Sequence, residues 1–518
     1  MTGRLRSAAG DFGRMLRAEW TKLRTVPGWV ATVAGALLAV LAVGLVGTAA
    51  TNPNPGRTEL PVGPGGQAVN DSFSFVHRTL SGDGTLTVPV LGLTSVNADG
   101  PQGSSPGPAA EWAKAGIIVK AGLDQGSPYA AVTATGSHGV RWQYDYTHDA
   151  AGRPGLPTDT APQWLRLTRT GDTVTGYDSA DGEHWTRIGT ARLPGLPRTA
   201  QVGLFATSPE RAEDTGTGTG LTPAVATGRF GPAVLSGGWA PPAGDGPDGA
   251  GGWTGSLVGA DAGTSGSYLP GVPGGYAREG AGFTVTGAGD IAAVVGGPAL
   301  AGGRTVENSL VGTFAGLAAL AVVATGCATA EYRRGLIALT LAASPRRGLL
   351  PVAKALPIAA LALLVGTAAA AVAVPLGTAW STAHGFPVAV VPGAVELRVV
   401  LGTGLLLAAS CVLALALGLL LRRAAPAIAA TVGGLVLPYL LATSGALPVG
   451  ASEWLLRVTP AAGFAIQQSL PRLPQVFTLY TPASGYYPLS PWAGLAVLTA
   501  WAAAALLAAV VLIRRRDA

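Results

Sequence analysis

The chain has few charged residues and almost no cysteine for its length. Of its 518 residues, 12% are charged and 48% are hydrophobic, and the mean hydropathy is +0.39. This composition is too apolar for an ordinary soluble protein. Cys327 and Cys411 both lie inside apolar runs, so the long polar region can form no disulfide and no cysteine metal site. The five histidines lack the spacing of metal ligands. The composition therefore favours a membrane protein and predicts no metal site.

The chain also lacks a phosphate-binding loop. Such a loop requires a lysine directly after a glycine, followed by serine or threonine. None of the lysines of this chain follows a glycine; they are Lys22, Lys114, Lys120 and Lys354. We therefore expect no P-loop ATPase site and no bound cofactor in this chain.

Charge is divided unevenly along the sequence. Residues 51–307 hold 15 Lys and Arg against 22 Asp and Glu, a net charge of −7, and the remainder holds 19 against 6, a net charge of +13. Basic residues beside apolar runs are typical of a surface facing anionic lipid, and no basic stripe of the nucleic-acid-binding kind is present. We expect a basic membrane part joined to a weakly acidic soluble part, with lipid as a partner and no nucleic acid.

Six apolar runs are long enough to cross a hydrocarbon core of about 30 Å as helices. They cover residues 27–50, 308–330, 352–376, 397–421, 426–446 and 491–513. Residues 1–26 have the pattern of an amphipathic helix lying on the inner leaflet. A cleaved signal peptide is the alternative for the first run, but that run exceeds the usual length of its hydrophobic region.

The basic residues outside these runs predict a topology. Arginine clusters fall on one side of the membrane if the six helices alternate. The positive-inside rule then places both termini in the cytoplasm and residues 51–307 outside a multi-pass protein of the plasma membrane. Residues 331–354 would be a basic cytoplasmic segment. Residues 451–470 are too polar to cross, and we expect them to lie at the outer interface or to form a re-entrant helix.

Residues 51–307 are predicted to hold an all-β sandwich. Short stretches alternate apolar and polar residues, and turn signals separate them, as in half-buried antiparallel strands. Asp181-Gly182 is a strong hairpin signal because the turn needs positive φ. The sandwich would cover residues 67–239. Residues 240–307, rich in Gly and Pro, could be a flexible stalk or add strands. The fold class is therefore a polytopic α-helical membrane protein of about six transmembrane helices, with a large extracellular sandwich inserted after the first.

Three stretches of this insertion resemble the concanavalin-like lectin/glucanase sandwich family. They are AKAGIIVKA at 113–121, PQWLRLTRTGDTVTGYDSADGEHWTRIGT at 162–190 and QVGLFATS at 201–208. Some members of that superfamily bind or cleave glycans, so the resemblance permits a surface glycan as a ligand. Trp142, Tyr144 and Tyr146 are spaced two positions apart, so in a strand they share one face and could stack on sugar rings. Such a stripe of aromatic residues is also typical of a core.

The membrane part resembles the permease subunits of actinobacterial type-two ABC exporters. Three stretches carry the likeness: RAEWTKLRTVPGW at 17–29, EYRRGLIALTLAASPRRG at 331–348 and WLLRVTPAAGFA at 454–465. The resemblance implies an interfacial N-terminal helix and a coupling helix between the second and third spans that touches a separate ATPase. The residues it implies in ATPase coupling are Glu19, Trp20, Lys22, Glu331, Tyr332, Arg333, Arg334, Gly335, Pro345, Arg346 and Arg347. The large insertion departs from the short loop common in that family.

The resemblance implies a transport subunit and not an enzyme. We expect it to couple to a separate P-loop ATPase that binds ATP, and to pair with a second permease as a homodimer or heterodimer. The apolar runs carry essentially no charge away from their ends, which disfavours a proton-coupled carrier and favours export of lipid-like or amphipathic cargo. The alternatives are a membrane-anchored surface binding protein that holds glycan or peptide with its sandwich, and a channel or scaffold.

Overall fold

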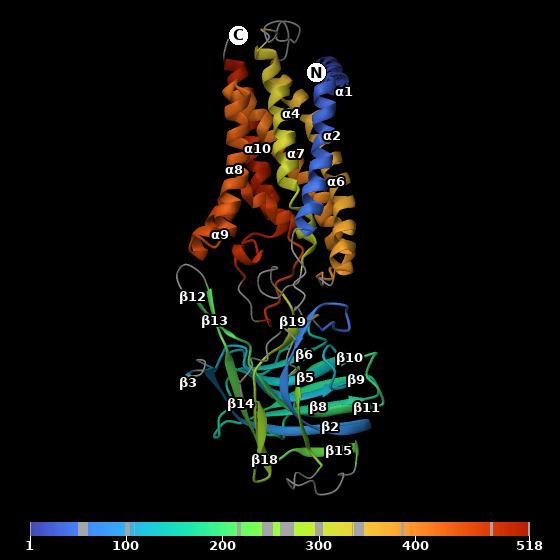
Figure 1. Cartoon of the computed structure of the whole chain (residues 1–518), viewed down its shortest axis with the longest axis vertical. Helices are drawn as coiled ribbons and strands as arrows, with labels where there is room; N and C mark the ends of the chain where they lie inside the picture. The colour runs from blue at the N-terminus through green and yellow to red at the C-terminus, as the bar shows by residue number, and fades with distance from the viewer. Residues whose placement is uncertain are drawn as a thin grey trace. The chain divides into compact units, whose positions relative to one another are not determined.

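The computed structural model of the chain contains two compact units (Figure 1). A helical unit comprises Met1–Pro53, Gly296–Leu470 and Tyr480–Ala518, and a β unit comprises Asn54–Val295 and Pro471–Leu479. The structure describes residues 2–49, 61–98, 104–107, 109–214, 219–240, 252–259, 274–295, 304–333, 335, 347–384, 388–476 and 480–515. The fold class predicted from the sequence, long apolar helices with a β-sandwich inserted after the first of them, is confirmed.

The helical unit is built from long apolar helices with short helical turns between them. Its α-helices are α1 (Thr2–Thr25), α2 (Pro27–Ala49), α4 (Thr313–Arg333), α6 (Leu350–Ala383), α7 (Gly393–Leu421), α8 (Ala424–Thr443), α9 (Val449–Val458) and α10 (Pro491–Arg515). Its 3₁₀ turns are η2 (Val306–Leu310), η3 (Arg347–Leu349), η4 (Pro460–Gln467) and η5 (Pro482–Ser484). Pro27 at the first position of α2 separates it from α1, since proline lacks the amide hydrogen that a continuous helix would use.

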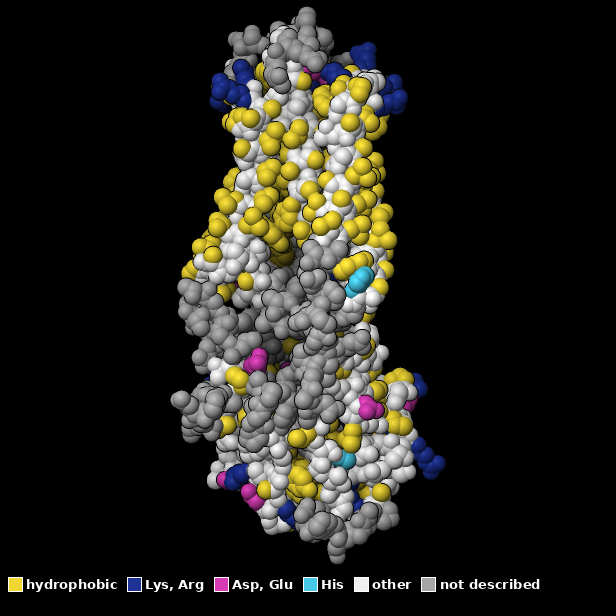
Figure 2. All heavy atoms as spheres, in the orientation of Figure 1, with side chains coloured by type: hydrophobic (Ala, Val, Ile, Leu, Met, Phe, Trp, Pro, Cys, Tyr) yellow, Lys and Arg dark blue, Asp and Glu magenta, His cyan; other side chains and the backbone are white. Residues whose placement is uncertain are grey.

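Six helices of the described residues are long and apolar enough to cross a membrane. They begin at Pro27, Val306, Leu350, Gly393, Ala424 and Pro491. Figure 2 shows hydrophobic side chains over the visible face of these helices, while Lys and Arg gather at the end that carries the two termini. This distribution is the one expected of helices that face hydrocarbon between two polar boundaries.

Helix α7 is central in the helical unit and packs on α4, α6, α8 and α10. Small residues let it approach α6 closely: a side chain at Gly366 would lie 2.9 Å from the Cα of Gly404. Contacts of this kind are typical of helices that pack without a hydrophobic driving force between them. The residues predicted as re-entrant form α9 and η4. Every residue of η4 after Pro460 is buried, and η4 packs on α7, α8 and α10.

The β unit is an antiparallel sandwich. Its first strands are β1 (Val69–Asp71), β2 (Phe73–Ala98), β3 (Ser104–Gly107), β4 (Lys114–Lys120), β5 (Tyr129–Thr135), β6 (Val140–Tyr144), β7 (His148–Ala151), β8 (Gln163–Thr170), β9 (Thr173–Ser179) and β10 (Thr186–Arg192). They are followed by β11 (Thr199–Thr207), β12 (Arg211–Asp214), β13 (Thr219–Thr222), β14 (Ala224–Phe230), β15 (Val234–Trp239), β16 (Thr254–Val258), β17 (Gly275–Glu279), β18 (Gly282–Gly287) and β19 (Ile291–Ala293).

The long strand β2 organises the sandwich. Its first part pairs with β11 and β16, its middle with β8 and β15, and its last part with β14 and β3. The main sheet has the order β10-β9-β8-β2-β11-β4-β5-β6-β7. The predicted hairpin is confirmed between β9 and β10, where Gly182 has a φ of 79°. Asp181 orders this turn, since its Oδ1 accepts the amides of Glu183 and His184 at 2.9 and 2.8 Å.

Two apolar clusters lie on opposite faces of the sheet that contains β4 and β5. The larger contains Ile117 and Val132, and the smaller contains Ile118 and Tyr129. Successive residues of a strand point to opposite faces of the sheet, so each of these strands contributes side chains to both clusters. Both strands are therefore buried along their whole length. The second face is covered by β1, β16 and β19, whose members of the smaller cluster are Val69, Val258, Ile291 and Ala293.

Two segments extend the β unit beyond the predicted residues 67–239. The described strands of 240–307 pair with it: β16 with β2, β18 with β14 and β17, and β19 with β1. They add strands, as one of the two alternatives for that region expects. The second segment, Pro471–Leu479, comes from the connection between η4 and α10. There Gln475 Nε2 donates to the Thr147 carbonyl at 2.8 Å, and Val476 packs with Ala292 and Val295.

Candidate functional site

A cluster of four charged residues joins three helices at one end of the helical unit. Glu19 and Lys22 come from α1, Glu331 from the last turn of α4, and Lys354 from the first turns of α6. Lys22 Nζ lies 2.8 Å from Glu19 Oε1 and 2.9 Å from Glu331 Oε1. Lys354 Nζ lies 3.2 Å from Glu19 Oε2 and 2.8 Å from Glu331 Oε1. Two cations and two anions thus alternate in what we call the charge cluster.

The members of the charge cluster differ in exposure. The Lys354 side chain is 2% exposed and that of Glu331 is 10% exposed, whereas that of Lys22 is 45% exposed. Burial lowers the pKa of Lys22, but its hydrogen bonds to Glu19 and Glu331 and their charges outweigh burial and leave the pKa above its ordinary value. In the described part of the chain, Glu331 Oε2 is buried without a hydrogen-bond partner. An uncompensated change at Lys354 would therefore be costly.

The other residues that the resemblance places in ATPase coupling lie around this cluster or beyond the described part. Trp20 is 41% exposed on α1. Tyr332 lies under Arg422, whose guanidinium carbon is 5.2 Å from its ring centroid. Arg333 ends α4, Gly335 is exposed with a φ of 66°, and Arg347 begins η3. Three residues fall outside the described residues: Arg334, Pro345 and Arg346.

Trp142, Tyr144 and Tyr146 were expected to form an exposed stacking surface, but two of the three are buried. Trp142 is 2% exposed and belongs to the larger apolar cluster, while Tyr146 is 1% exposed and belongs to the smaller one. They are on opposite faces because β6 ends at Tyr144, and the positive φ of Asp145 (45°) and Tyr146 (66°) breaks the alternation. Tyr144 is half-buried, and its ring stacks on His148 at 4.1 Å.

Tyr146 belongs to a buried polar group of the β unit. Its hydroxyl donates to Asp71 Oδ2 at 2.7 Å, and Lys120 Nζ lies 2.6 Å from the same oxygen. Burial, helped by the charge of Asp71, raises the pKa of Tyr146 well above its ordinary range, so this phenol remains a donor. Because β1 and the turn after β6 hold these groups under the smaller apolar cluster, we assign them to stability and not to ligand binding.

The burial of His77 predicts that the β unit loses stability in acid. It is buried, with Nδ1 at 2.8 Å from Gln201 Oε1 and Nε2 at 2.9 Å from Ser256 Oγ. Burial lowers its pKa below the ordinary 6.5, although the hydrogen bond to Gln201 opposes this shift. The unfolded chain therefore binds a proton at His77 more readily than the folded one, and stability should fall as the pH drops below about 6.5.

The measurement for this prediction is hydrogen exchange of β2 and β11 peptides in the full chain as a function of pH. His77→Gln should flatten the loss of protection on acidification, while His138→Gln, at an exposed position, should leave it as in the natural chain. An unchanged acid response of His77→Gln would contradict the assignment.

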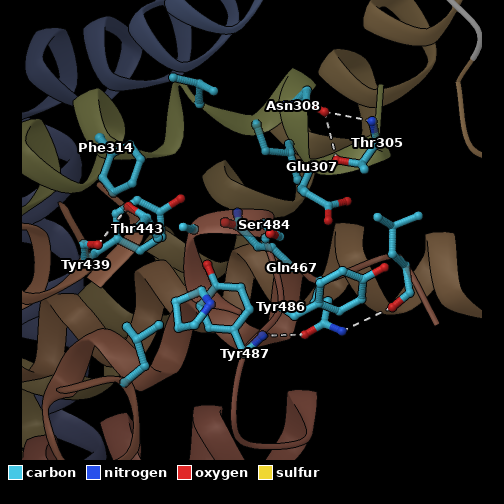
Figure 3. Close-up of a pocket in the computed structure, with 18 residues that line it drawn as sticks. Thr305, Glu307, Asn308, Phe314, Tyr439, Thr443, Gln467, Ser484, Tyr486 and Tyr487 are labelled. Carbon is cyan, nitrogen blue, oxygen red and sulfur yellow. Dashed lines mark hydrogen bonds between the residues drawn. The ribbon is translucent and has the colours of Figure 1, made fainter. Parts of the chain in front are cut away.

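A cavity of about 190 Å³ lies in the helical unit, where the chain enters α4. Figure 3 shows residues that line it, among them Glu307, Phe314, Tyr439, Gln467, Tyr486 and Tyr487. Glu307 Oε1 accepts the Ser469 amide at 3.3 Å, and Glu307 Oε2 accepts the Ser469 hydroxyl. The charge cluster is at the other end of α4, about 30 Å away along a helix of 21 residues.

Sequence reasoning did not single out this cavity or the partners of Lys354. Glu307 stands alone before the second apolar run, and a lone acid at such a position is a recognised sign of a functional site. The charged residues of the candidate spans lie near the span ends, as Glu307, Glu331 and Lys354 do. Their partners come from residues up to 335 positions away, which no local pattern shows.

No family model matches the chain, and no curated protein matches it. Among solved structures it is similar to a functionally unknown protein from Saccharomyces cerevisiae, with 19% identity, 35% of this chain and 82% of that chain covered, and a TM-score of 0.21. It is also similar to scytalido-glutamic peptidase with a transition state analog inhibitor, with 10% identity, 43% and 100% covered, and a TM-score of 0.26. A GH43 protein from Bacillus licheniformis has 15% identity, 24% of each chain covered and a TM-score of 0.17. None of these similarities carries a functional conclusion.

Proposed function

We propose that this chain is the membrane-spanning subunit of an ATP-driven exporter of the plasma membrane, and that a separate P-loop ATPase docks against residues 331–354 and α1. The observation that carries the proposal is the charge cluster. It bonds Glu19 and Lys22 of α1 to Glu331 at the end of α4 and Lys354 at the start of α6. These are the segments to which the resemblance to exporter permeases assigns contact with the ATPase.

The cluster gives a physical route for coupling. A force applied to residues 334–346 would act on the end of α4 and the start of α6 together, because Glu331 and Lys354 are joined at 2.8 Å. Helix α1 would follow through Lys22, and α4 and α6 both pack on α7. Such ion-paired helix ends move as one body more readily than independently. In this proposal ATP binding brings two ATPase subunits together, and paired permeases, identical or different, alternate their opening across the bilayer.

The proposal is tested by purifying the tagged full-length chain in mild detergent. Stoichiometric companions are identified by mass spectrometry, and ATPase activity is measured on the same sample. We expect a P-loop ATPase to co-purify. Its absence from a folded preparation would favour the alternative of a membrane-anchored binding protein.

A charge reversal in the basic segment should uncouple the two subunits. Arg346→Glu together with Arg347→Glu places two negative charges where the resemblance expects the ATPase to dock. Reversed charges at a protein interface cost several kcal/mol by repulsion, so we expect co-purification and transport-linked ATPase activity to fall by about tenfold or more.

The matched control replaces the same two residues by lysine, which keeps their charge. That variant should retain most of the co-purified ATPase. Full retention of the ATPase by a well-expressed double glutamate variant would exclude this segment as the docking site.

A further inference from the structure

We propose that the cavity around Glu307 is a binding site for an organic ammonium group, such as the alkylated amine head of an amphiphile. This inference goes beyond transport and does not depend on an ATPase. Its lining joins one carboxylate to a wall of aromatic rings in a space of about 190 Å³, enough for a small head group.

The carboxylate of Glu307 supplies the charge. It lines the cavity and remains partly accessible, and it accepts hydrogen bonds from the amide and the hydroxyl of Ser469. An ionised carboxylate has about four acceptor positions, so these donors leave room for a ligand. Within the described residues, the ion pairs of the helical unit involve Glu19, Glu331 and Glu453, and Glu307 takes part in none of them. A carboxylate in such surroundings attracts a cation.

Arg398 is a cationic residue that interacts with Glu307 electrostatically, and it does not line the cavity. Its Nη2 donates to the Gln468 carbonyl at 2.6 Å, and it is absent from the cavity wall. Tyr439 and Tyr487 also face the charge of Glu307, and both are neutral phenols hydrogen-bonded to each other. The wall around the carboxylate therefore presents no competing cation among the described residues.

Aromatic rings supply the second half of the recognition. Phe314, Tyr439, Tyr486 and Tyr487 line the cavity. Phe314 and Tyr439 are held in place by Phe464, with ring centroids 5.0 and 4.9 Å away. Aromatic faces attract alkylated ammonium ions, which are weakly hydrated, and a nearby carboxylate adds to that attraction. An anion would be repelled by Glu307. A neutral alcohol would gain neither the attraction to the carboxylate nor the attraction of a cation to the aromatic faces.

The test is isothermal titration of the full chain in uncharged maltoside micelles with three probes of similar shape. Choline carries the ammonium group, dimethylbutanol is its uncharged carbon isostere, and trimethylacetate is an anion. We expect saturable binding of choline at one site per chain, and binding of the other two at least tenfold weaker, because only choline carries the positive charge that the carboxylate and the aromatic faces attract.

Two variants make the assignment specific. Glu307→Gln keeps an acceptor for Ser469 and should weaken choline binding roughly tenfold or more, while Phe314→Leu, which removes a ring, should weaken it several-fold. Glu396→Gln, an acid of α7 outside the cavity, is the matched control and should bind as the natural chain does. Equal affinity for choline and dimethylbutanol, no saturable choline binding, or unchanged binding by a folded Glu307→Gln variant would overturn the proposal.

Discussion

Replacing Lys354 by methionine should lower the stability of the helical unit by about 3–5 kcal/mol, the usual cost of removing one partner of a buried ion pair. Lys354 is nearly inaccessible and contacts both Glu19 and Glu331. Methionine preserves most of the side-chain volume, so the loss reports charge and not a cavity. Without Lys354 the two carboxylates would share the half-exposed Lys22 alone. The measurement is unfolding of the full chain in mixed micelles by increasing dodecyl sulfate, followed by helical circular dichroism.

Two comparisons separate this effect from a general loss of packing. Lys22→Met should cost about 1 kcal/mol or less, since its side chain is 45% exposed and water can replace its contacts. The double variant Lys354→Met with Glu331→Met should be more stable than Lys354→Met alone, because it removes a cation and an anion together. Equal losses at Lys22 and Lys354 would show that the charge cluster does not hold the three helices as we infer.

Asp71→Asn should destabilise the β unit by a similar amount, about 3–5 kcal/mol. Asp71 and Lys120 are both completely inaccessible and lie 2.6 Å apart, and Asp71 also accepts the Tyr146 hydroxyl and the Gly126 amide, at 2.7 and 2.8 Å. Asparagine would leave Lys120 without its counter-charge. The expected result is faster hydrogen exchange throughout β4 and β5 in the full chain, measured by mass spectrometry on peptides from those strands.

The matched control for that result is a surface ion pair of the same sandwich. Arg192 Nε lies 2.9 Å from Asp172 Oδ2, but the two side chains are 78% and 38% exposed. Asp172→Asn should therefore leave the exchange rates close to those of the natural chain. If Asp71→Asn and Asp172→Asn gave the same exchange rates, the buried polar group would contribute nothing specific to the sandwich.

The long apolar helices were predictable because their signal is local. A run such as that of α2 or α7 is long and uninterrupted. Each residue adds to the hydrophobicity of the run independently of the residues that it contacts in the fold. The hairpin at Asp181-Gly182 was equally local, since its turn needs positive φ and glycine supplies it. Residues Leu165 and Leu167 alternate with polar neighbours in β8, and the structure buries them in that alternation.

The aromatic residues of β6 show where local patterns fail. Trp142 and Tyr146 are an even number of positions apart, which in a regular strand places them on one face. Two consecutive residues with positive φ move Tyr146 to the other face, where it meets Asp71 and Lys120. Neither Asp145 nor Tyr146 is a glycine, so the sequence does not indicate the positive φ of that turn. The same limit applies to β4 and β5, whose second face is covered by strands that are distant in the chain.

The sequence by itself determined the number of candidate spans, the position of the inserted sandwich, the absence of a P-loop and the basic segment between the second and third spans. Each of these depends on composition, length or spacing within one stretch of chain. Only the tertiary structure decided that Lys354 pairs with Glu19 and Glu331, that Pro471–Leu479 belongs to the β unit, and that Glu307 faces a cavity walled by aromatic rings. These features join residues far apart in the chain, and the free energy that selects them arises from burial and charge pairing that exist only once the chain has folded.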